Sequence, residues 1–364
     1  MAILQKIIVQ DFRNISFAEL SFSAGVNCIC GDNGQGKTNL LDAIYLLSMT
    51  KSAFGLTDQM CVRHGCRDYS IAGTYSLSDG LEARFTVSGG ASGKTVRRDG
   101  KAYPKVSAHI GVLPVVMVSP QDSVLVSESG EERRRFVNSV LSQLDPAYLA
   151  ALQRYNRFLA HRNRMLKDGV ADPTLLDVLD AGMSECAAAV EKARSEFSAC
   201  LEDAVSQLYS LLSGGCESVG IRYQSDLKGR PLADVLASCR ERDLCMKYTT
   251  AGVQRDDFIF TMDGHPIRRC GSQGQQKSFL VALKLSQLRI MQREYGSAPV
   301  LLLDDVFDKL DASRMSHLLD VVCRDGYGQI FITDTMRTRI EEAASSIHAG
   351  AVYFTARNGE FQAG

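Results

Sequence analysis

Residues 31–38 read Gly-Asp-Asn-Gly-Gln-Gly-Lys-Thr, and this stretch decides the fold. The apolar run 26–29 before it predicts a buried strand, and the amphipathic stretch 37–49 predicts a helix. A complete G-x-x-x-x-G-K-T between a strand and a helix is typical of a phosphate-binding loop. Its glycines let backbone N–H groups point at phosphate oxygens, and the helix offers its positive end to the same anion.

The residues of this loop are expected to have different roles. Lys37 would supply a mobile cation to the β- and γ-phosphates, and Thr38 would supply a hydroxyl ligand to Mg²⁺. Nothing in the sequence resembles a guanine-reading motif, so ATP with Mg²⁺ is the favoured ligand. The nucleotide contacts predicted from the loop are Gly31, Asp32, Asn33, Gly34, Gln35, Gly36, Lys37 and Thr38.

An acidic strand end completes the predicted site. The apolar run 300–303 predicts a strand, and Asp304 and Asp305 follow it directly. A carboxylate at the carboxyl end of a parallel strand lies beside a phosphate loop. We therefore expect Asp304 to hold Mg²⁺ through water and Asp305 to polarise the attacking water. An acidic turn after a strand is the alternative interpretation, and the presence of the phosphate loop favours the catalytic one.

Composition limits the possible functions. The chain has 364 residues, of which 45% are hydrophobic and 23% charged, and its net charge is −1. Such a chain can bury a sizeable core, and any DNA-binding charge must be gathered locally. The 11 cysteines lack zinc-ligand spacing and are expected to be small buried hydrophobes. Neither a signal peptide nor an apolar run of about 20 residues is recognised, which favours a soluble cytoplasmic protein.

Periodicity separates a head from an insertion. Strand-like runs dominate 3–30 and 70–118, with Asp99-Gly100 as a hairpin turn, whereas helical periodicity dominates 131–213. The last third is predicted to contain strands near 258–262, 300–303 and 329–333 and helices near 276–295, 313–322 and 337–345. We expect an α/β P-loop NTPase head of the ABC type, with mixed sheets and flanking helices, carrying a mainly helical arm. The expected segments are 1–130 and 248–364 for the head and 131–247 for the arm.

Residues 272–277 read Ser-Gln-Gly-Gln-Gln-Lys directly before a strongly apolar helix. A serine here caps the helix and leaves an anion site at its N-terminus, although an ordinary cap has the same appearance. The order of elements resembles that of ABC ATPases, in which this signature contacts the γ-phosphate bound by the other subunit. Gln121 then looks like the Q-loop residue and Asp311 like the D-loop aspartate, while Thr333 or Asp334 stands where the switch histidine is usual. This resemblance implies catalytic roles for Asp305, Gln121 and Lys37, metal binding by Thr38, Asp304 and Gln121, and nucleotide contacts from Ser272, Gly274, Gln275 and Asp311.

Along nearly its whole length the sequence resembles the RecF family. The segments that carry the resemblance are Asp11–Asn14, GDNGQGKTNLLDAIYLLS at 31–48, SPQD at 119–122, RRRF at 133–136, LAHRNRMLK at 159–167, QRDDF at 254–258, SQGQQK at 272–277 and LLLDDVFDKLD at 301–311. One departure precedes Arg255, where the family commonly has Gly-Pro-His and this chain has Gly252-Val253-Gln254. Any role of that histidine is therefore not carried over.

The resemblance implies more than composition or periodicity can show. It implies a lobed ABC head with a helical arm, an ATP-dependent homodimer and weak, DNA-stimulated ATP hydrolysis. It also implies binding of double-stranded DNA near single-strand gaps, and partnership with RecR and RecO in loading RecA. These are expectations for recombinational DNA repair, replication and the SOS response to DNA damage.

A local basic stripe is the candidate DNA contact. Arg154, Arg157, His161 and Arg164 are spaced 3, 4 and 3 residues apart, which places them on one helix face. Such a face can neutralise phosphates without reading sequence, although a solvated face that pairs with nearby acids is equally compatible. The predicted DNA contacts are Arg154, Arg157, Arg162, Arg164 and Lys167. A second basic cluster around the 99–100 hairpin could instead protect a sheet edge; it consists of Lys94, Arg97, Arg98, Lys101 and Lys105.

Two other functions fit parts of this pattern. A chromosome-organising ATPase of the SMC type would need heptads sustained far beyond the insertion 131–247, and these are not present. The nucleotide-binding subunit of a membrane transporter would need a much shorter head and has no place for the insertion. The RecF-like interpretation is therefore favoured over both, with no membrane partner.

Overall fold

The computed structural model divides the chain into two compact units. The described residues are 2–77, 80–169, 172–215, 217–227, 229–306, 328–336, 338 and 351–364. The first unit comprises Met1–Ser123, Leu211–Gly215 and Ser272–Gly364, and the second comprises Val124–Ser210 and Cys216–Gly271. Both ends of the chain thus build the first unit, and the second lies wholly within the segment between them.

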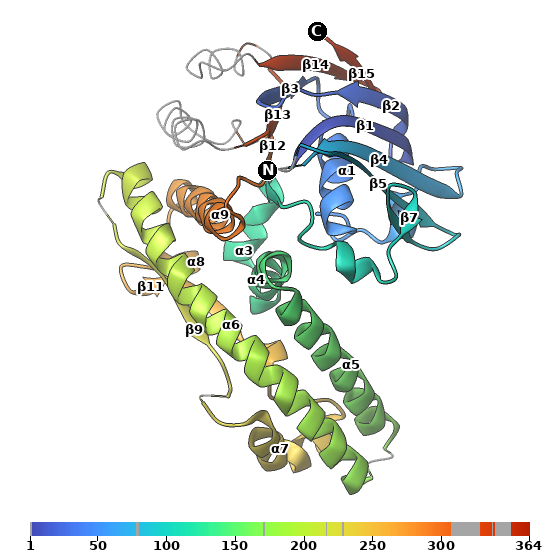
Figure 1. Cartoon of the computed structure of the whole chain (residues 1–364). Helices are drawn as coiled ribbons and strands as arrows, with labels where there is room; N and C mark the ends of the chain where they lie inside the picture. The colour runs from blue at the N-terminus through green and yellow to red at the C-terminus, as the bar shows by residue number, and fades with distance from the viewer. Residues whose placement is uncertain are drawn as a thin grey trace. The chain divides into compact units, whose positions relative to one another are not determined.

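The first unit contains two sheets of six strands (Figure 1). The strands of one are β1 (Ile3–Phe12), β2 (Ile15–Ser21), β4 (Asp68–Ser76), β5 (Glu82–Gly90), β6 (Thr95–Arg98) and β7 (Lys101–Ala102), in the order β2-β1-β4-β5-β6-β7. The strands of the other are β3 (Val26–Cys30), β8 (Val115–Val118), β12 (Val300–Asp304), β13 (Ile330–Asp334), β14 (Val352–Arg357) and β15 (Glu360–Ala363), in the order β15-β14-β3-β13-β12-β8. The first sheet is antiparallel, and the second is parallel from β14 to β8.

One helix joins the cores of these sheets. The described helices of this unit are α1 (Lys37–Met49), α2 (Asp58–Cys61), η1 (Val106–His109), η2 (Pro120–Ser123) and α9 (Gln273–Tyr295). Helix α1 contacts strands of both sheets, and its buried residues Leu40, Leu41 and Leu47 belong to a core cluster shared with β1, β4 and β12. A helix with apolar residues on most of its surface must be covered on two sides, which explains its position.

The predicted elements of the first unit are confirmed wherever the structure describes them. The strand 26–29 is β3, and the helix 37–49 is α1. The hairpin at Asp99-Gly100 joins β6 to β7 with positive φ at both residues, 49° and 80°, as a two-residue turn requires. The predicted helix 313–322 lies outside the described residues, and so does 337–345 apart from residue 338.

The second unit combines helices with a small antiparallel sheet (Figure 1). Its helices are α3 (Val124–Ser127), α4 (Gly130–Leu144), α5 (Pro146–Asp168), most of α6 (Pro173–Ser213), α7 (Leu232–Met246), η3 (Val253–Arg255) and α8 (Ile267–Cys270). Its strands, in the order β11-β10-β9, are β9 (Val219–Gln224), β10 (Asp257–Met262) and β11 (His265–Pro266). The compact unit therefore runs from Val124 to Gly271 rather than over the expected 131–247. The difference arises because β9 pairs with β10, which draws the segment after 247 into the unit.

Arg162 corrects one expectation from the sequence. The basic segment predicts a DNA contact for Arg162, but its side chain is fully buried. Its Nε donates to Asp180 Oδ1 of α6 at 2.6 Å, and its Nη1 donates to Asp243 Oδ2 of α7 at 2.7 Å and to Thr249 Oγ1 at 2.9 Å. The guanidinium therefore links α5, α6 and α7 inside the unit. A helix buries one stripe of its surface, and Arg162 lies on that stripe with Tyr155 and not with the exposed basic residues.

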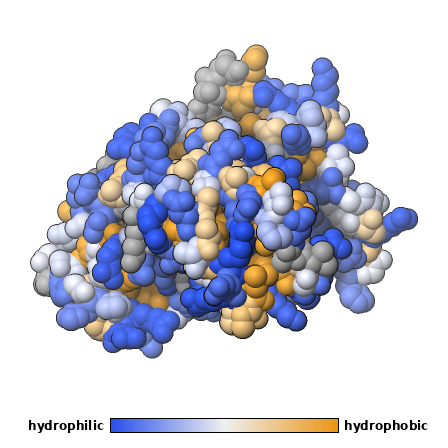
Figure 2. Space-filling view, turned by 90° about the horizontal axis from the view of Figure 1, so that it is seen from below, coloured by the Kyte–Doolittle hydropathy of each residue, from blue (hydrophilic) through white to orange (hydrophobic). Residues whose placement is uncertain are grey.

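Surface chemistry is mixed. Figure 2 shows one face on which hydrophilic side chains dominate and apolar side chains are scattered between them. Among the described helices, none combines the length and the apolar character needed to cross a bilayer. Cysteines 28, 30, 61 and 186 are buried, as expected, whereas Cys245 and Cys270 are exposed.

We predict that Arg162→Ala lowers the free energy of unfolding by about 3–5 kcal/mol, because it leaves the buried carboxylates of Asp180 and Asp243 without their shared cation. Urea unfolding of the full chain measures this change. Arg164→Ala is the matched control on the same helix: its side chain is 83% exposed, and we expect a change within about 0.5 kcal/mol. Equal losses in the two variants would contradict the inferred role of Arg162.

Candidate nucleotide site

The phosphate loop connects β3 to α1 in the way that the sequence predicts. Gly36, which precedes α1, has φ 105°, a conformation that side chains rarely adopt. At Gly31 an added Cβ would lie 2.5 Å from the Ala356 carbonyl oxygen, so this position has no room for a side chain. The Lys37 ammonium donates to the carbonyl oxygens of Gly31, at 2.7 Å, and of Asp32, at 3.1 Å. The Lys37 side chain therefore lies over the phosphate loop, where it is expected to bind phosphate.

Residues outside the motif brace the loop. Asn14 accepts a hydrogen bond from Asn39 Nδ2 of α1 at 2.6 Å, and its own amide lies 3.4 Å from the Gly34 carbonyl oxygen. Across the loop, the backbone N–H groups of Asn358 and Gly359 donate to the side chain and the carbonyl of Gln35, at 2.6 and 2.9 Å. The sequence pointed to Asn14 only through the 11–14 segment. No sequence pattern predicts the contact from residues 358–359, because the turn between β14 and β15 lies next to the loop only after the sheet has folded.

Parallel pairing places the acidic strand end beside the loop. Strands β3, β13 and β12 are consecutive and parallel, so their carboxyl ends meet at one edge. Asp304 ends β12, and its Oδ1 accepts from Thr38 Oγ1 at 2.9 Å and from Thr333 Oγ1 at 2.9 Å. The Asp305 N–H donates to the same Thr333 hydroxyl at 3.0 Å. Thr333 thus links Asp304 and Asp305. The sequence alone does not predict this link.

The surroundings of the Asp304 carboxylate favour the binding of a cation. Burial raises the pKa of the Asp304 carboxyl, and the neighbouring Asp305 carboxylate raises it further, whereas the two threonine hydroxyls and Lys37 oppose the rise. A buried carboxylate is best stabilised by a nearby positive charge. Hydroxyl and carboxylate oxygens are the donor set that Mg²⁺ takes in nucleotide sites, so Thr38 and Asp304 fit that ion. Lys37 and the loop N–H groups fit the triphosphate that accompanies it.

Gln121 lies at the same edge of the sheet. It belongs to η2, which follows β8 directly, and β8 is paired in parallel with β12. Its side chain is exposed, and the turn around it is held by Asp122, which accepts from the Ser119 N–H at 2.7 Å. Lys284 of α9 pairs with Asp122 at 2.7 Å and donates to the Met117 carbonyl at 2.9 Å. The position of Gln121 is therefore fixed from the signature helix as well as from the sheet.

The signature residues form a complete helix cap. Ser272 Oγ accepts from the Gln275 N–H at 3.3 Å, and Gln275 Oε1 accepts from the Ser272 N–H at 2.7 Å. Ser272 is exposed, so this helix end is open to solvent in the single chain. Helix α9 begins at Gln273, three residues before the predicted start at 276, because the capping pair lies further upstream. Asp311, the other residue assigned to this function, lies outside the described residues.

The basic stripe on α5 is mostly confirmed as a surface feature. Arg154, Arg157, His161, Arg164 and Lys167 are exposed. Two of these residues have acidic neighbours: Arg154 lies 3.2 Å from Glu185, and Arg164 lies 3.9 Å from Asp168. Both pairs are well exposed to solvent, so they bind weakly and can exchange for other anions.

The basic residues around the Asp99-Gly100 hairpin are less available for binding DNA than those of α5. Lys94 forms an ion pair with Asp58 at 2.7 Å and donates to the Thr50 carbonyl at 2.6 Å, so it stabilises the first unit internally. Arg98 lies over the Phe85 ring, 5.6 Å from its centroid, and 3.7 Å from Asp99. These contacts favour the interpretation that the hairpin charges protect a sheet edge.

The chain is similar to known proteins over nearly its whole length. A family model described as an AAA domain matches residues 6–135. The DNA replication and repair protein RecF of Porphyromonas gingivalis is 41% identical over 361 residues, with 98% of this chain and 99% of that protein covered. RecF of Bacteroides fragilis is 40% identical over 359 residues, with 98% and 97% covered.

Solved structures give the same result. A structure of the recombination mediator protein RecF with ATP, from the RecFOR pathway, is 30% identical and superposes with a TM-score of 0.90 over 100% of this chain and 97% of that one. An Smc head domain from Pyrococcus furiosus, 14% identical with a TM-score of 0.58, shares the fold alone. The full-length coverage and the identity lead to one conclusion: the chain belongs to the RecF family.

Proposed function

We propose that this chain is an ATP-dependent mediator of recombinational DNA repair that binds duplex DNA as an ATP-held dimer. The observation that carries the proposal is the joining of Thr38, Asp304 and Thr333 by hydrogen bonds at the parallel strand ends, next to the Lys37 loop. This arrangement is a nucleotide switch rather than a structural turn. The relatives named as DNA replication and repair proteins, matched over their full length, supply the biological context.

Each residue of the site has a proposed role. Lys37 and the N–H groups of 31–38 hold the triphosphate of ATP. Thr38, Asp304 and Gln121 hold Mg²⁺, which supplies charge neutralisation between the phosphates. Asp305 polarises water. The Thr333 hydroxyl accepts a hydrogen bond from the Asp305 N–H and so fixes the orientation of Asp305. Thr333 is a positioning residue in place of the usual histidine, which is consistent with weak hydrolysis.

The dimer is proposed from the exposed signature cap. The positive end of a helix dipole attracts an anion, and the exposed Ser272 leads this helix end. In the proposed dimer Ser272, Gly274 and Gln275 of one copy, together with Asp311, complete the nucleotide site of the other. ATP then favours the closed dimer by its higher affinity for that state, and hydrolysis releases it.

The DNA contact is proposed on the exposed face of α5. Arg154, Arg157, Arg164 and Lys167 remain from the expected set after the removal of Arg162. Such a face binds the phosphate backbone of duplex or gapped DNA without reading bases. In the cytoplasm the chain would act with RecR and RecO in loading RecA. An SMC-type function is not favoured, because the likeness to the Smc head extends to the fold only.

Replacing Thr333 with valine is expected to slow ATP hydrolysis about tenfold or more while leaving ATP affinity nearly unchanged. Valine keeps the shape but removes the hydroxyl that joins Asp304 to the Asp305 N–H, and a hydrogen bond to a charged group contributes about 1.5–3 kcal/mol. Single-turnover hydrolysis and binding of a fluorescent ATP analogue measure the two effects. Thr333→Ser keeps the hydroxyl and should retain most activity. A serine variant as slow as the valine variant would contradict the proposed role.

Mixing two defective variants is expected to restore dimers. Lys37→Ala loses a loop cation and Ser272→Arg blocks the signature cap, so neither protein alone should dimerise with ATP. In a mixed dimer one nucleotide site combines the intact Lys37 with the intact Ser272. Sedimentation velocity with ATP therefore detects a dimer in the mixture only. A mixture that stays monomeric would show that Ser272 does not act on the nucleotide of the other copy.

Removing the α5 cations is expected to weaken duplex binding and to flatten its salt dependence. Each phosphate contact contributes about 0.9 to the slope of log K against log salt, so Arg157→Ala, Arg164→Ala and Lys167→Ala together should reduce the slope by up to about three such steps. Fluorescence anisotropy with labelled duplex DNA in the presence of ATP measures it. Arg242→Ala on α7, which also removes an exposed cation, is the control. An unchanged slope in the triple variant would place DNA elsewhere.

A further inference from the structure

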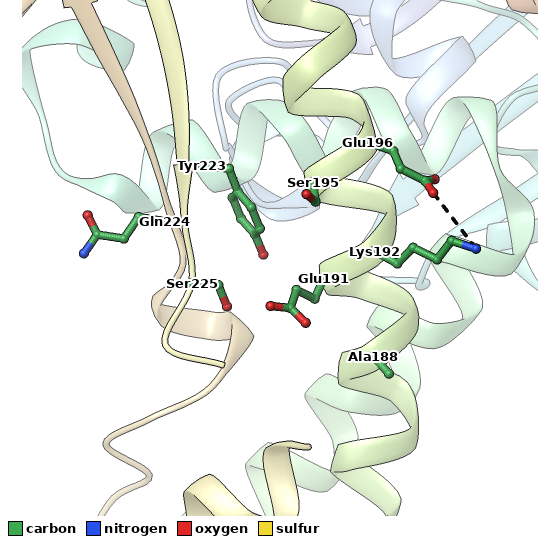
Figure 3. Close-up of a pocket in the computed structure, with 8 residues that line it drawn as sticks. All are labelled: Ala188, Glu191, Lys192, Ser195, Glu196, Tyr223, Gln224 and Ser225. Atoms are coloured by element: carbon green, nitrogen blue, oxygen red, sulfur yellow. Dashed lines mark ion pairs between the residues drawn. The ribbon is translucent and has the colours of Figure 1, made fainter. Parts of the chain in front are cut away.

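A pocket of about 660 Å³ lies within the second unit, between α6 and the strand β9 and its continuation (Figure 3). Its lining residues are Ala188, Glu191, Lys192, Ser195, Glu196, Tyr223, Gln224 and Ser225. None of these residues belongs to the nucleotide site or to the basic face of α5. The RecF-type function leaves the pocket without a role.

Glu191 gives the pocket its charge. Figure 3 shows its carboxylate pointing from α6 toward Ser225 and the Tyr223 hydroxyl. Lys192 does not neutralise it, because the Lys192 ammonium turns away and lies 4.0 Å from Glu196. Among the described residues, Glu191 has no ion-pair partner within 4 Å. Burial raises the pKa of the Glu191 carboxyl, and the nearby Asp256 raises it further.

A second carboxylate lies behind the pocket wall. Asp256 is fully buried, and its Oδ2 accepts from Tyr223 Oη and from Arg194 Nη1, each at 2.6 Å. Its Oδ1 is also buried and has no hydrogen-bond partner in the part of the chain that the structure describes. Such an acceptor is costly to leave unpaired. The Ser225 hydroxyl favours the charged form of both Asp256 and Glu191, but one hydroxyl has a single hydrogen to donate.

The surroundings thus contain more acceptors than donors. Arg194 is committed to Asp256, to the Val253 carbonyl at 2.6 Å and to Asn138 at 3.0 Å, so it has little to offer Glu191. No group of three or more His, Cys, Asp or Glu able to hold a metal ion occurs among the described residues. A cation with several N–H donors fits this donor deficit better than a metal ion does. Phosphate is disfavoured, because the nearest charge is negative.

We propose that this pocket binds a guanidinium group, presented as an arginine side chain by a partner protein. A guanidinium offers five donors in a planar fork that matches a carboxylate, and its stem and plane can lie along an aromatic ring such as Tyr223. Helix α6 also has acidic residues on its surface, namely Asp177, Glu185, Glu196, Glu202 and Asp203, whereas its Asp180 is buried and paired with Arg162. In this proposal the second unit has two binding helices: the basic helix α5 contacts DNA, and the acidic helix α6 contacts a partner protein.

The test uses the full chain without nucleotide or DNA, so that its result does not depend on the proposed function. The probe is a fluorescent pentapeptide with blocked ends and one central arginine, followed by anisotropy. A second peptide carries citrulline, which keeps the shape of arginine and lacks its charge. We expect the arginine peptide to bind and the citrulline peptide to bind at least about tenfold more weakly, as the loss of a charged hydrogen bond implies. Equal binding of both peptides would overturn the proposal.

Variants locate the site. Glu191→Gln should weaken the arginine peptide about tenfold, whereas Asp203→Asn, which removes an equal charge from the same helix outside the pocket, should leave binding unchanged. Ala188→Arg should block the pocket with a cation of its own, and Ala189→Arg, an exposed neighbour that does not line it, should not. Loss of binding in both arginine variants or in neither would contradict the assignment.

The source of the cation is tested separately. N-acetyl-arginine amide and spermidine are used to displace the bound peptide. Displacement by the arginine amide, with spermidine weaker, supports recognition of an arginine side chain. Displacement by spermidine at lower concentration than by any arginine probe would replace the partner protein with a polyamine and overturn the proposal.

Discussion

The hydrogen bond between Thr38 and Asp304 is the contact on which the nucleotide site depends. It joins residues 266 positions apart, one from the phosphate loop and one from the end of β12. One oxygen comes from the loop and the other from the strand end, so the pair of oxygen donors exists only where the two segments meet. The parallel order β3-β13-β12 makes the contact possible, because it brings three strand ends to one edge. The contact therefore joins the two halves of the first unit, which a long insertion separates in the sequence.

Loop bracing follows from the same constraint. A glycine-rich loop has high conformational freedom, which must be removed before it can hold a phosphate. In this chain Asn14 and the 358–359 turn restrain the loop from two sides. The Lys284–Asp122 pair restrains the Gln121 turn in the same way from α9. The nucleotide site is thus preorganised by polar contacts that come from outside its motifs.

The second unit buries some of its arginines between carboxylates and leaves others exposed. Arg162 and Arg194 are buried and lie between carboxylates and hydroxyls, where they fix the packing of α5, α6, α7 and the segment before β10. The exposed arginines of α5 remain solvated and can meet phosphate. The same residue type is therefore found in two environments, and burial distinguishes them. Basic residues outnumber acidic ones in α5, whereas acidic residues outnumber basic ones in α6.

Local sequence determined the elements that depend on near neighbours. The phosphate loop, helix 37–49, the Asp99-Gly100 hairpin and the Ser272 cap could all be predicted, because turn chemistry, capping and periodicity act within a few residues. Motif order along the chain also predicted the α/β head with its arm and the pairing of Asp304 with the loop.

Tertiary structure decided what depends on distant partners. The stripe of α5 that faces inward determined that Arg162 is an internal ion-pair residue, although it stands in the same basic segment as Arg164. Strand pairing between β9 and β10 extended the second unit beyond residue 247. Thr333 gained its position between two acidic residues, and Glu191 its place near Asp256, only through folding. Sequence records which charges a chain carries, but the free energy of each charge depends on burial and on partners that only the folded chain brings together.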